Sequence, residues 1–479
     1  MAKFGFCGGT YQSQSPTFAA DLTMNLYPEI VEIPTAASGI VLYPTPGSEL
    51  FVALGGTSVR GIFAINSRLF AVTGSTLHEV FGNGTSVSRG TVLDDGFLVS
   101  MAASRTELLV ASGGTLYVFT LATNLLTTIP SGTITDISIV EYIDGFFLAL
   151  GKDSQTFRIS NVSDATAWPG DQIIQVSVFP DNIVSMISDH RELWIFGVTK
   201  SVVYYDSGSP QIFDVIPGAI IETGIIAPAS PAKLDNTIMW LGGDERGPAI
   251  VWRAQGYTPK RVSNHAIEFA MQGYTTISDA EGYSYQDQGH SFYVLYFPTA
   301  DTTWVFDAAS GMWHERGFLD LGVFEAHHSR SHTYVFGKHL VGDWSTGNIN
   351  AISISLFEDN GSPIRRIRRS PHISQERNWF FHHKLQVDIQ VGLGPTPPLL
   401  DGAGNPRDPV IEMRFSDTSA KTWSNTQSIG FGQVGQYSTR AIWRRLGRSR
   451  DRIYEIAVSD PVPVRIVDAY LEVSPGSGG

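Results

Sequence analysis

The segment "RLFAVTGSTLHEVFG", residues 68–82, joins two strand-like runs through a tight turn. Its first half is apolar at nearly every position, as expected for a strand with both faces buried. Its second half alternates between apolar and polar residues, as in a strand with one face toward solvent. The segment therefore predicts two neighbouring antiparallel strands.

The same unit recurs along the middle of the chain. The first strands read "RLFAVTG" (68–74), "ELLVASG" (107–113), "GFFLALG" (145–151), "ELWIFGV" (192–198), "TIMWLGG" (237–243), "SFYVLYF" (291–297) and "HTYVFGK" (332–338). The partner strands read "TLHEVFG", "TLYVFTL", "TFRISNV", "SVVYYDS", "AIVWRAQ" and "TWVFDAA", with "GNINAISI" as the less clear last candidate.

The spacing of the unit, roughly 40–55 residues, is the length of a four-stranded propeller blade. One blade cannot bury both of its faces, so the units must stack and close into a ring. The sequence therefore predicts an all-β fold with a β-propeller of about seven blades over residues 59–369.

Both ends of the chain lack the repeat. We expect residues 370–479 to form a second, smaller β domain, an assembly platform, which the N-terminal arm at 1–58 joins. The Pro/Gly-rich stretch 392–409 predicts an exposed loop inside a long hairpin. "DRIYEIAVSD" and "VRIVDAYLEV" predict two further strands. The stretch "NHAIEFAMQGY" is a weak helical candidate.

The composition is that of a folded protein. Of 479 residues, 42% are hydrophobic and only 16% are charged, so long disordered stretches are not expected. The single cysteine, Cys7, excludes a disulfide or a Cys-based zinc site within one chain. No apolar run is long enough for a transmembrane helix, and the start does not resemble a signal peptide. We therefore expect synthesis in the cytoplasm and no insertion of this chain into a membrane.

Charge is unevenly distributed along the chain. The formal net charge is −13, yet residues 361–452 hold 15 Lys or Arg and 7 Asp or Glu, a net of +8, which leaves −21 elsewhere. Two arginine-rich runs, 362–371 and 439–452, account for much of this excess. Candidate interface residues in them are Arg365, Arg366, Arg368, Arg369, Trp443, Arg444, Arg445, Arg448, Arg450 and Arg452.

These arginines have three interpretations. They could bind nucleic acid, contact a neighbouring subunit or domain, or form a solvated surface. Trp443 and Leu446 in the middle of the second run favour a subunit or domain contact, because a phosphate-binding strand needs no apolar anchors. The acidic remainder of the chain would supply the carboxylates.

The sequence shows no set of catalytic residues. "RFSDTSAKTWS" (414–424) is similar to the Asp-box turn of sialidases, in which the aspartate bonds backbone N–H groups, but its spacing departs from that pattern. It motivates the alternative hypothesis of a glycan-binding or glycan-cleaving propeller. Two histidine groups, 327–332 and 382–383, lie in strand-like sequence, where side chains alternate between faces, so a metal site is not favoured. We expect no enzyme activity, no cofactor and no metal.

Both ends of the chain resemble a known family. The relevant stretches are "YQSQSPTFAADLTMNLYPEI" (11–30), "LYPTPGSELF" (42–51) and "AIWRRLGRSRDRIYEIAVSDPVPVRIVDAYLEV" (441–473). They look like the packaged-DNA stabilisation proteins of short-tailed phages, also called tail accessory factors or nozzle proteins. The matching positions are Asn25–Glu29, Pro46–Gly47, Trp443 with Leu446–Gly447, Arg450, and Asp460–Pro461.

The resemblance implies a structural virion protein of the tail and no enzyme. Such proteins form a ring of six copies below the head-to-tail connector, extend and close the DNA channel, and carry further tail components. The implied partners are the other copies, a connector, adaptor or portal ring above, a tail needle, spike or fibre below, and the genomic DNA. An acidic channel wall would suit DNA that must slide, because a broad basic surface would bind its phosphates.

Overall fold

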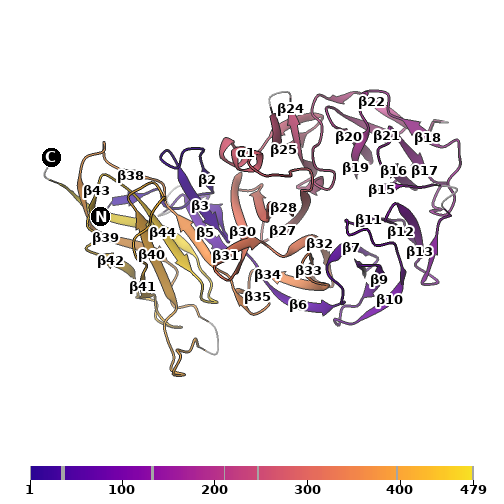
Figure 1. Cartoon of the computed structure of the whole chain (residues 1–479). Coiled ribbons are helices and arrows are strands. Elements are labelled where there is room, and N and C mark those ends of the chain that lie inside the picture. Colours follow the sequence, from indigo (N-terminus) through magenta and orange to yellow (C-terminus); the bar gives the residue numbers. More distant parts are fainter. Residues whose placement is uncertain are drawn as a thin grey trace.

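The computed structural model describes residues 2–33, 38–130, 134–209, 211–244, 247–394 and 398–476. It has two parts, a ring of β-sheets and a β-sandwich attached to one side of it (Figure 1). Both parts are built from β-strands, which pair antiparallel almost throughout. The prediction of an all-β fold is therefore confirmed. The helix among the described residues, α1 (His265–Gln272), starts at Asn264, whose side chain accepts a hydrogen bond from the backbone of Ile267.

The ring contains seven four-stranded units, five of which are separate sheets. The first blade consists of β7 (Val59–Ile65), β8 (Arg68–Thr73), β9 (Thr76–Val80) and β10 (Ser86–Thr91), and the second of β11 (Ser100–Ala103), β12 (Glu107–Ser112), β13 (Thr115–Thr120) and β14 (Leu125–Thr128). The third consists of β15 (Ile137–Ile143), β16 (Phe146–Gly151), β17 (Thr156–Ile159) and β18 (Ile173–Gln175), and the fourth of β19 (Ile183–Asp189), β20 (Glu192–Gly197), β21 (Ser201–Asp206) and β22 (Phe213–Ile221). The fifth consists of β23 (Ala232–Leu234), β24 (Thr237–Asp244), β25 (Gly247–Gln255) and β26 (Thr258–Arg261). The other two belong to larger sheets. The sixth blade consists of β27 (Glu281–Asp287), β28 (His290–Phe297), β29 (Thr302–Asp307) and β30 (Met312–Asp320). The seventh consists of β32 (Ser329–Val335), β33 (Lys338–Asp343), β34 (Asn348–Ser353) and β6 (Gly47–Ala53).

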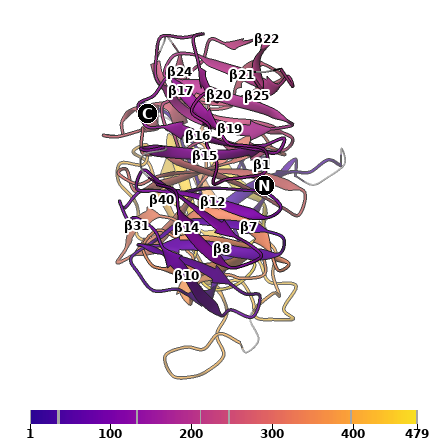
Figure 2. The same ribbon diagram turned by 90° about the vertical axis from the view of Figure 1, so that its right-hand side faces the viewer.

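Buried side chains between neighbouring blades explain the apolar central strands. Phe70 of the first blade and Phe119 of the second, for example, pack edge to face with centroids 5.2 Å apart. A cluster of this kind joins each blade to the next. The ring closes because Leu340 and Val52 of the last blade pack with Val59 and Leu69 of the first. Figure 2 shows this ring from its outer edge.

The last blade differs from the sequence interpretation. "HTYVFGK" lies in β32 and the following turn, one strand earlier than its counterparts in the other blades, whereas "GNINAISI" does contain a central strand, β34. The outer strand of this blade is β6, from the expected N-terminal arm, which pairs with β34. At Gly47, where β6 begins, a Cβ atom would lie 2.5 Å from the Glu358 carbonyl oxygen, so the close approach of the two backbones needs glycine.

The sandwich has two sheets around one core. The first sheet contains β4 (Leu26–Ile30), β5 (Ile40–Pro44), β45 (Ile466–Pro475), β39 (Phe380–Ile389) and β42 (Ala441–Arg444), with β1 (Ala2–Phe4) and β43 (Arg448–Ser449) paired to it. The second contains β3 (Ala20–Met24), β37 (Arg366–Arg369), β44 (Asp451–Val458), β40 (Val410–Ser416) and β41 (Gln427–Gly430), with β2 (Tyr11–Gln12) and β38 (Ile373–Ser374) at its margin. The expected hairpin around residues 392–409 is wrong, because β39 and β40 lie in different sheets.

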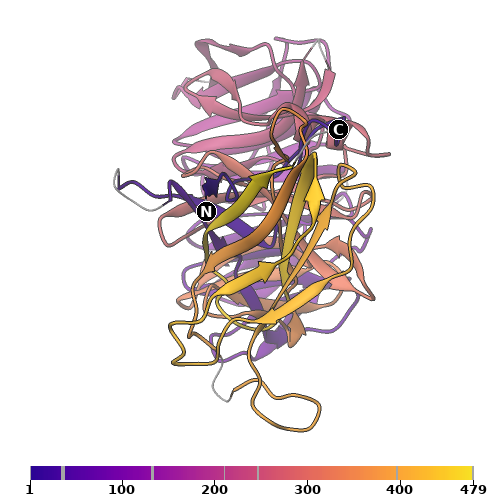
Figure 3. The ribbon, with the colours of Figure 1, turned by 90° about the vertical axis from the view of Figure 1, so that its left-hand side faces the viewer.

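The second sheet of the sandwich is continuous with the propeller. It runs from the outer strand of the sixth blade in the order β30, β3, β37, β44, β40, β41, so the N-terminal strand β3 lies between the two parts. Two short elements, β31 (Val323–Ala326) and the pair β35 (Glu358–Asp359) with β36 (Ser362–Pro363), flank this joint. Figure 3 shows the sandwich in front of the propeller, with both chain termini at its side.

The strands do not divide at the expected limits of 58 and 369. The arm contributes β1, β3, β4 and β5 to the sandwich, but β6 belongs to the propeller, and β37 belongs to the sandwich. The physical reason is closure: an outer strand from the N-terminus completes the last blade and satisfies its open edge.

Among the described residues, the 8-residue helix α1 is too short to cross a bilayer.

Candidate assembly interface

The first arginine run forms β37, in the joint between the propeller and the sandwich. Its neighbours are β3 on one side and β44 on the other. Arg366 and Arg368 are both 1% exposed, while Arg365 and Arg369 are partly exposed. The guanidinium groups of Arg366 and Arg368 are therefore buried within the chain and do not lie on its surface.

Arg368 binds the N-terminal arm. Its Nε donates to the carbonyl oxygen of Phe6 at 2.6 Å, its Nη1 donates to the hydroxyl of Thr23 at 2.8 Å, and its Nη2 lies 3.3 Å from an oxygen of Asp21. Because all three acceptors belong to the N-terminal arm, the arginine fixes the course of the arm over β37. This is a contact within the chain.

Arg366 lies on the propeller side of the same strand. It donates to the carbonyl oxygens of Ile364 and Phe357, each at 3.3 Å, and its Nε has no partner among the described residues. Burial lowers the pKa of Arg366 to about 10, an effect that the nearby Asp359 partly offsets. The group still carries its charge at neutral pH, so its burial is tolerated through these bonds.

The two outer arginines of the run contact carboxylates of the sandwich. Arg365 donates to Glu412 at 2.8 Å, and Arg369 donates to Glu455 at 2.9 Å. Arg369 and Arg414 also lie over the ring of Trp423, at 5.1 and 4.6 Å from its centre. These cation–π contacts and ion pairs fix the side chains in the sandwich.

The second run contributes both to the core and to the surface. Trp443 and Leu446 are each 3% exposed and belong to the core between the two sheets. Arg444 and Arg445 between them are both exposed. Strict alternation would place Trp443 and Arg445 on the same face, but Arg445 has a φ of 60° and turns the chain, so both anchors point inward.

Arg452 ends this run and is buried. Its Nε and Nη2 donate to the two oxygens of Asp417 at 2.6 and 2.7 Å, and its guanidinium lies 3.8 Å from the ring centre of Phe415. The Asp-box-like turn therefore works differently from the sequence expectation. The hydroxyl of Ser416, not Asp417, accepts the backbone N–H groups of Thr418 and Ala420.

Five arginines of the second run are exposed, Arg440 and the four candidates Arg444, Arg445, Arg448 and Arg450. Arg448 and Arg450 lie on the ring of Trp379, at 4.7 and 4.9 Å from its centre. These four of the ten candidates are on the surface and can contact another molecule. The other six have partners within the chain.

The histidines do not form one group. His327 lies 2.7 Å from the hydroxyl of Ser329, whereas the ring of His328 stacks on Phe318 and that of His332 on His339. His382 is buried beside Tyr454, while His383 faces outward. Among the described residues, no three His, Cys, Asp or Glu side chains are placed to hold a metal ion.

His382 is expected to make the sandwich sensitive to acid. Its ring lies 2.8 Å from both the Tyr454 hydroxyl and the Ser449 hydroxyl, and burial lowers its pKa from 6.5 to about 3. The unfolded chain takes up this proton below pH 6.5 and the folded chain does not. The contribution of His382 to the free energy of unfolding is therefore fully present above pH 6.5. It falls by about 1.4 kcal/mol per pH unit as the pH decreases toward 3.

The measurement is urea unfolding at several pH values between 7 and 4. His382→Gln should remove about that slope from the pH dependence. The exposed neighbour gives a matched control, since His383→Gln should leave the slope as in the unsubstituted protein. Equal slopes for all three proteins would contradict the assignment.

Two family models match the chain. The first, described as bacteriophage P22 Gp10, beta-propeller, covers residues 3–355, and the second, bacteriophage P22 Gp10, beta-sandwich, covers residues 365–474. The chain belongs to the bacteriophage P22 Gp10 family. This family consists of DNA-stabilisation proteins of the phage virion, so the expected resemblance is confirmed.

The match fits the two parts of the structure. The boundary between the two matches falls just before β37, although the Gp10 propeller match also includes the arm strands β3, β4 and β5, which lie in the sandwich. No curated protein matches the chain in sequence.

Several solved structures are similar to the chain at low sequence identity. The N-terminal domain of Nup159 has 10% identity and a TM-score of 0.40, with 70% of this chain and 99% of that chain covered. The Pan2 WD40 domain of Neurospora crassa has 10% identity and a TM-score of 0.42, with 62% and 89% covered. The designed protein Ika8 has 12% identity and a TM-score of 0.37, with 69% and 99% covered.

The sequence interpretation did not identify the residue that links the two parts of this Gp10 family member. Asn25, 1% exposed, donates to the carbonyl oxygens of Gly317 in β30 and of Arg365 before β37, at 2.8 and 2.9 Å. Its own side-chain oxygen accepts the N–H of Gly317 at 3.0 Å. Asn25 stands in the segment that carried the family resemblance, which was the available signal.

Proposed function

We propose that the protein is a ring-forming nozzle or hub of the virion tail. Six copies would lie below the head-to-tail connector, extend and close the DNA channel, retain the packaged genome and carry further tail components. The observation that carries this proposal is the match of the Gp10 family to both the propeller and the sandwich. The protein would be synthesised in the host cytoplasm and act without catalysis.

The partners follow from this position. A connector, adaptor or portal ring would lie above the six copies, and a needle, spike or fibre protein below. Genomic DNA would pass through the channel. A continuous sheet through β30, β3, β37 and β44 joins the propeller to the sandwich, which supports a structural role for the protein between other tail components.

The glycan-cleaving alternative gains no specific support. The turn that motivated it is stabilised by Ser416, and its acid, Asp417, is bound by Arg452. Asp417 thus has a structural partner in the turn, and the turn gives the alternative no support.

The test is particle assembly with and without the protein. Particles made without it should lack tails and lose their packaged DNA, and adding the purified protein should restore both. Mass spectrometry of intact particles should find it at a fixed copy number. Tailed, DNA-retaining particles that lack the protein would contradict the proposal.

A further inference from the structure

Arg444, Arg445, Arg448 and Arg450 lie on or beside β42 and β43, two short strands that pair with β39 at the end of the sandwich away from the propeller (Figure 1). We call this surface the basic end and define it as Trp379, Phe381, Arg444, Arg445, Arg448 and Arg450. Phe381 pairs with Arg448 across β39 and β43. Acidic residues close to these arginines are Glu376, Asp451, which His372 binds, and Glu472, while Asp388 and Asp468 lie further along β39 and β45. The four arginines, with Lys384 beside Arg444, outnumber the three close acids, so the surface is positively charged.

The side chains of the basic end are partly ordered before any partner binds. Arg448 and Arg450 both stack on Trp379, at 4.7 and 4.9 Å. Ordered guanidinium groups lose less conformational entropy on binding. Tryptophan and arginine are also the residue types that most often dominate the energy of protein interfaces.

The basic end also exposes apolar surface. Phe381 is 39% exposed, and Val473 on the adjacent strand β45 is 40% exposed. Phosphate groups of DNA need charge and hydrogen-bond donors and gain nothing from such side chains. An apolar centre with arginines around it is typical of a protein–protein contact.

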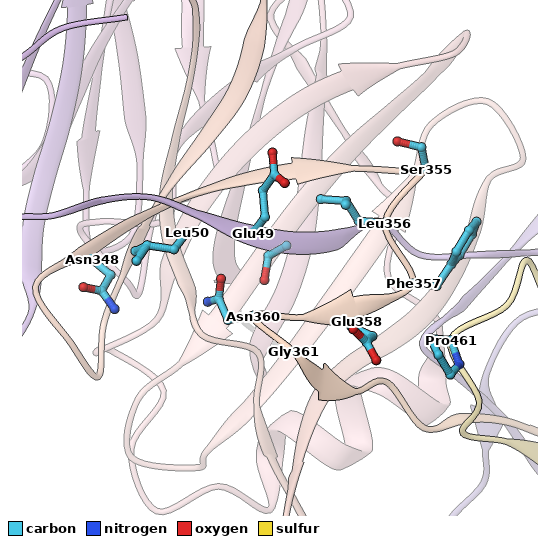
Figure 4. Close-up of a pocket in the computed structure, with 11 residues that line it drawn as sticks. Glu49, Leu50, Asn348, Ser355, Leu356, Phe357, Glu358, Asn360, Gly361 and Pro461 are labelled. Carbon is cyan, nitrogen blue, oxygen red and sulfur yellow. The ribbon is translucent and has the colours of Figure 1, made fainter. Parts of the chain in front are cut away.

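A complementary surface lies at the joint of the same chain. A groove of about 560 Å³ is formed by β6, β34, the turn before β35, and Pro461. We call it the acidic groove, with Glu49, Leu50, Leu356, Phe357 and Glu358 as its defining residues (Figure 4). It combines two carboxylates with apolar side chains, as the basic end combines arginines with aromatic rings.

The groups in the acidic groove are accessible. Leu50 is 54% exposed, and the side chain of Glu49 is 55% exposed. Lys338 approaches Glu49 at 3.7 Å, a distant surface pair that contributes little. The exposed Glu49 can therefore accept a guanidinium group of another molecule, and the partly exposed Glu358 lines the same groove.

We propose that the basic end of one copy docks in the acidic groove of the next copy. The proposal rests on the ring-forming function and names the surfaces that build the ring. The two surfaces lie on different parts of the molecule, so their contact is heterologous and repeats from copy to copy until the ring closes. A second copy fits better than DNA because both surfaces combine charge with apolar area.

Cysteine cross-linking between two singly substituted proteins tests the docking. In a Cys7→Ser background, Arg448→Cys and Glu49→Cys proteins are mixed and treated with a short bis-maleimide. We expect at least fivefold more cross-linked dimer than in a mixture of Arg448→Cys with Leu321→Cys, which is 98% exposed but outside the groove. The yield should fall at high salt, because exposed charges are screened.

Charge exchange provides the second measurement. Arg448→Glu with Arg450→Glu should reduce sedimentation-detected association at least tenfold, and a partner with Glu49→Arg and Glu358→Arg should restore it. Arg448, Arg450 and Glu49 are exposed and Glu358 is partly buried, so an unchanged melting temperature is required to show that each variant folds.

Two results would overturn the docking proposal. One is a cross-link yield no higher than that of the Leu321→Cys control. The other is binding of duplex DNA that the Arg448→Glu, Arg450→Glu variant loses, without any cross-link, which would assign the basic end to nucleic acid. Specific cross-linking of a protein absent from particles would instead contradict the proposed function and leave the docking intact.

Discussion

Replacing Arg368 by methionine is expected to lower the free energy of unfolding by about 3–5 kcal/mol, the range for breaking one side of a buried ion pair. The substitution leaves the Phe6 carbonyl oxygen, the Thr23 hydroxyl and Asp21 without their shared donor. Because these acceptors belong to the N-terminal arm, the arm should also detach. Urea unfolding measures the loss, and faster hydrogen exchange in β3 reports the detachment.

A surface arginine of the same sandwich gives the matched control. Arg444→Met should change the free energy of unfolding by no more than about 0.5 kcal/mol, since Arg444 is exposed. If Arg368→Met and Arg444→Met are equally stable, the buried guanidinium does not hold the arm.

Asn25→Ala should separate the propeller from the sandwich as well as destabilise the chain. The change leaves the carbonyl oxygens of Gly317 and Arg365 and the N–H of Gly317 without this partner, at about 1–3 kcal/mol for a buried group left unpaired. The φ of 55° at this position adds roughly 1 kcal/mol for alanine. Urea unfolding should change from one transition to two, as the parts lose their coupling.

Glycine at the same position separates the two causes. Asn25→Gly adopts the positive φ without strain but still lacks the amide, so it should recover about 1 kcal/mol of the loss and keep the two transitions. A single transition with nearly unchanged stability in both variants would show that the amide does not couple the parts.

Most of the propeller was predictable from the sequence because neighbouring blades bury both faces of the central strands. Runs such as "RLFAVTG" are apolar for this reason, and six of the seven were assigned to the correct strand of their blade. The last blade was shifted by one strand. Its outer strand β6 comes from about 300 residues earlier in the chain, and no local pattern reveals that pairing.

The candidate interface was less predictable. The first run has arginines on both faces of β37, namely Arg365 and Arg369 on one and Arg366 and Arg368 on the other. Because both faces carry the same residue type, the sequence does not reveal which face is buried. The acceptors of Arg368 are backbone and hydroxyl groups of the arm, and only the fold brings them near. The positive φ of Arg445, which turns Trp443 and Leu446 inward together, is likewise a property of the local fold.

A reconstruction of the tail in purified particles by electron cryo-microscopy tests most directly whether the protein forms a ring below the connector. We expect six copies in a ring directly below the connector, around the DNA, with the basic end of each copy in the acidic groove of its neighbour. A tail whose channel below the connector is built without this protein would contradict this expectation.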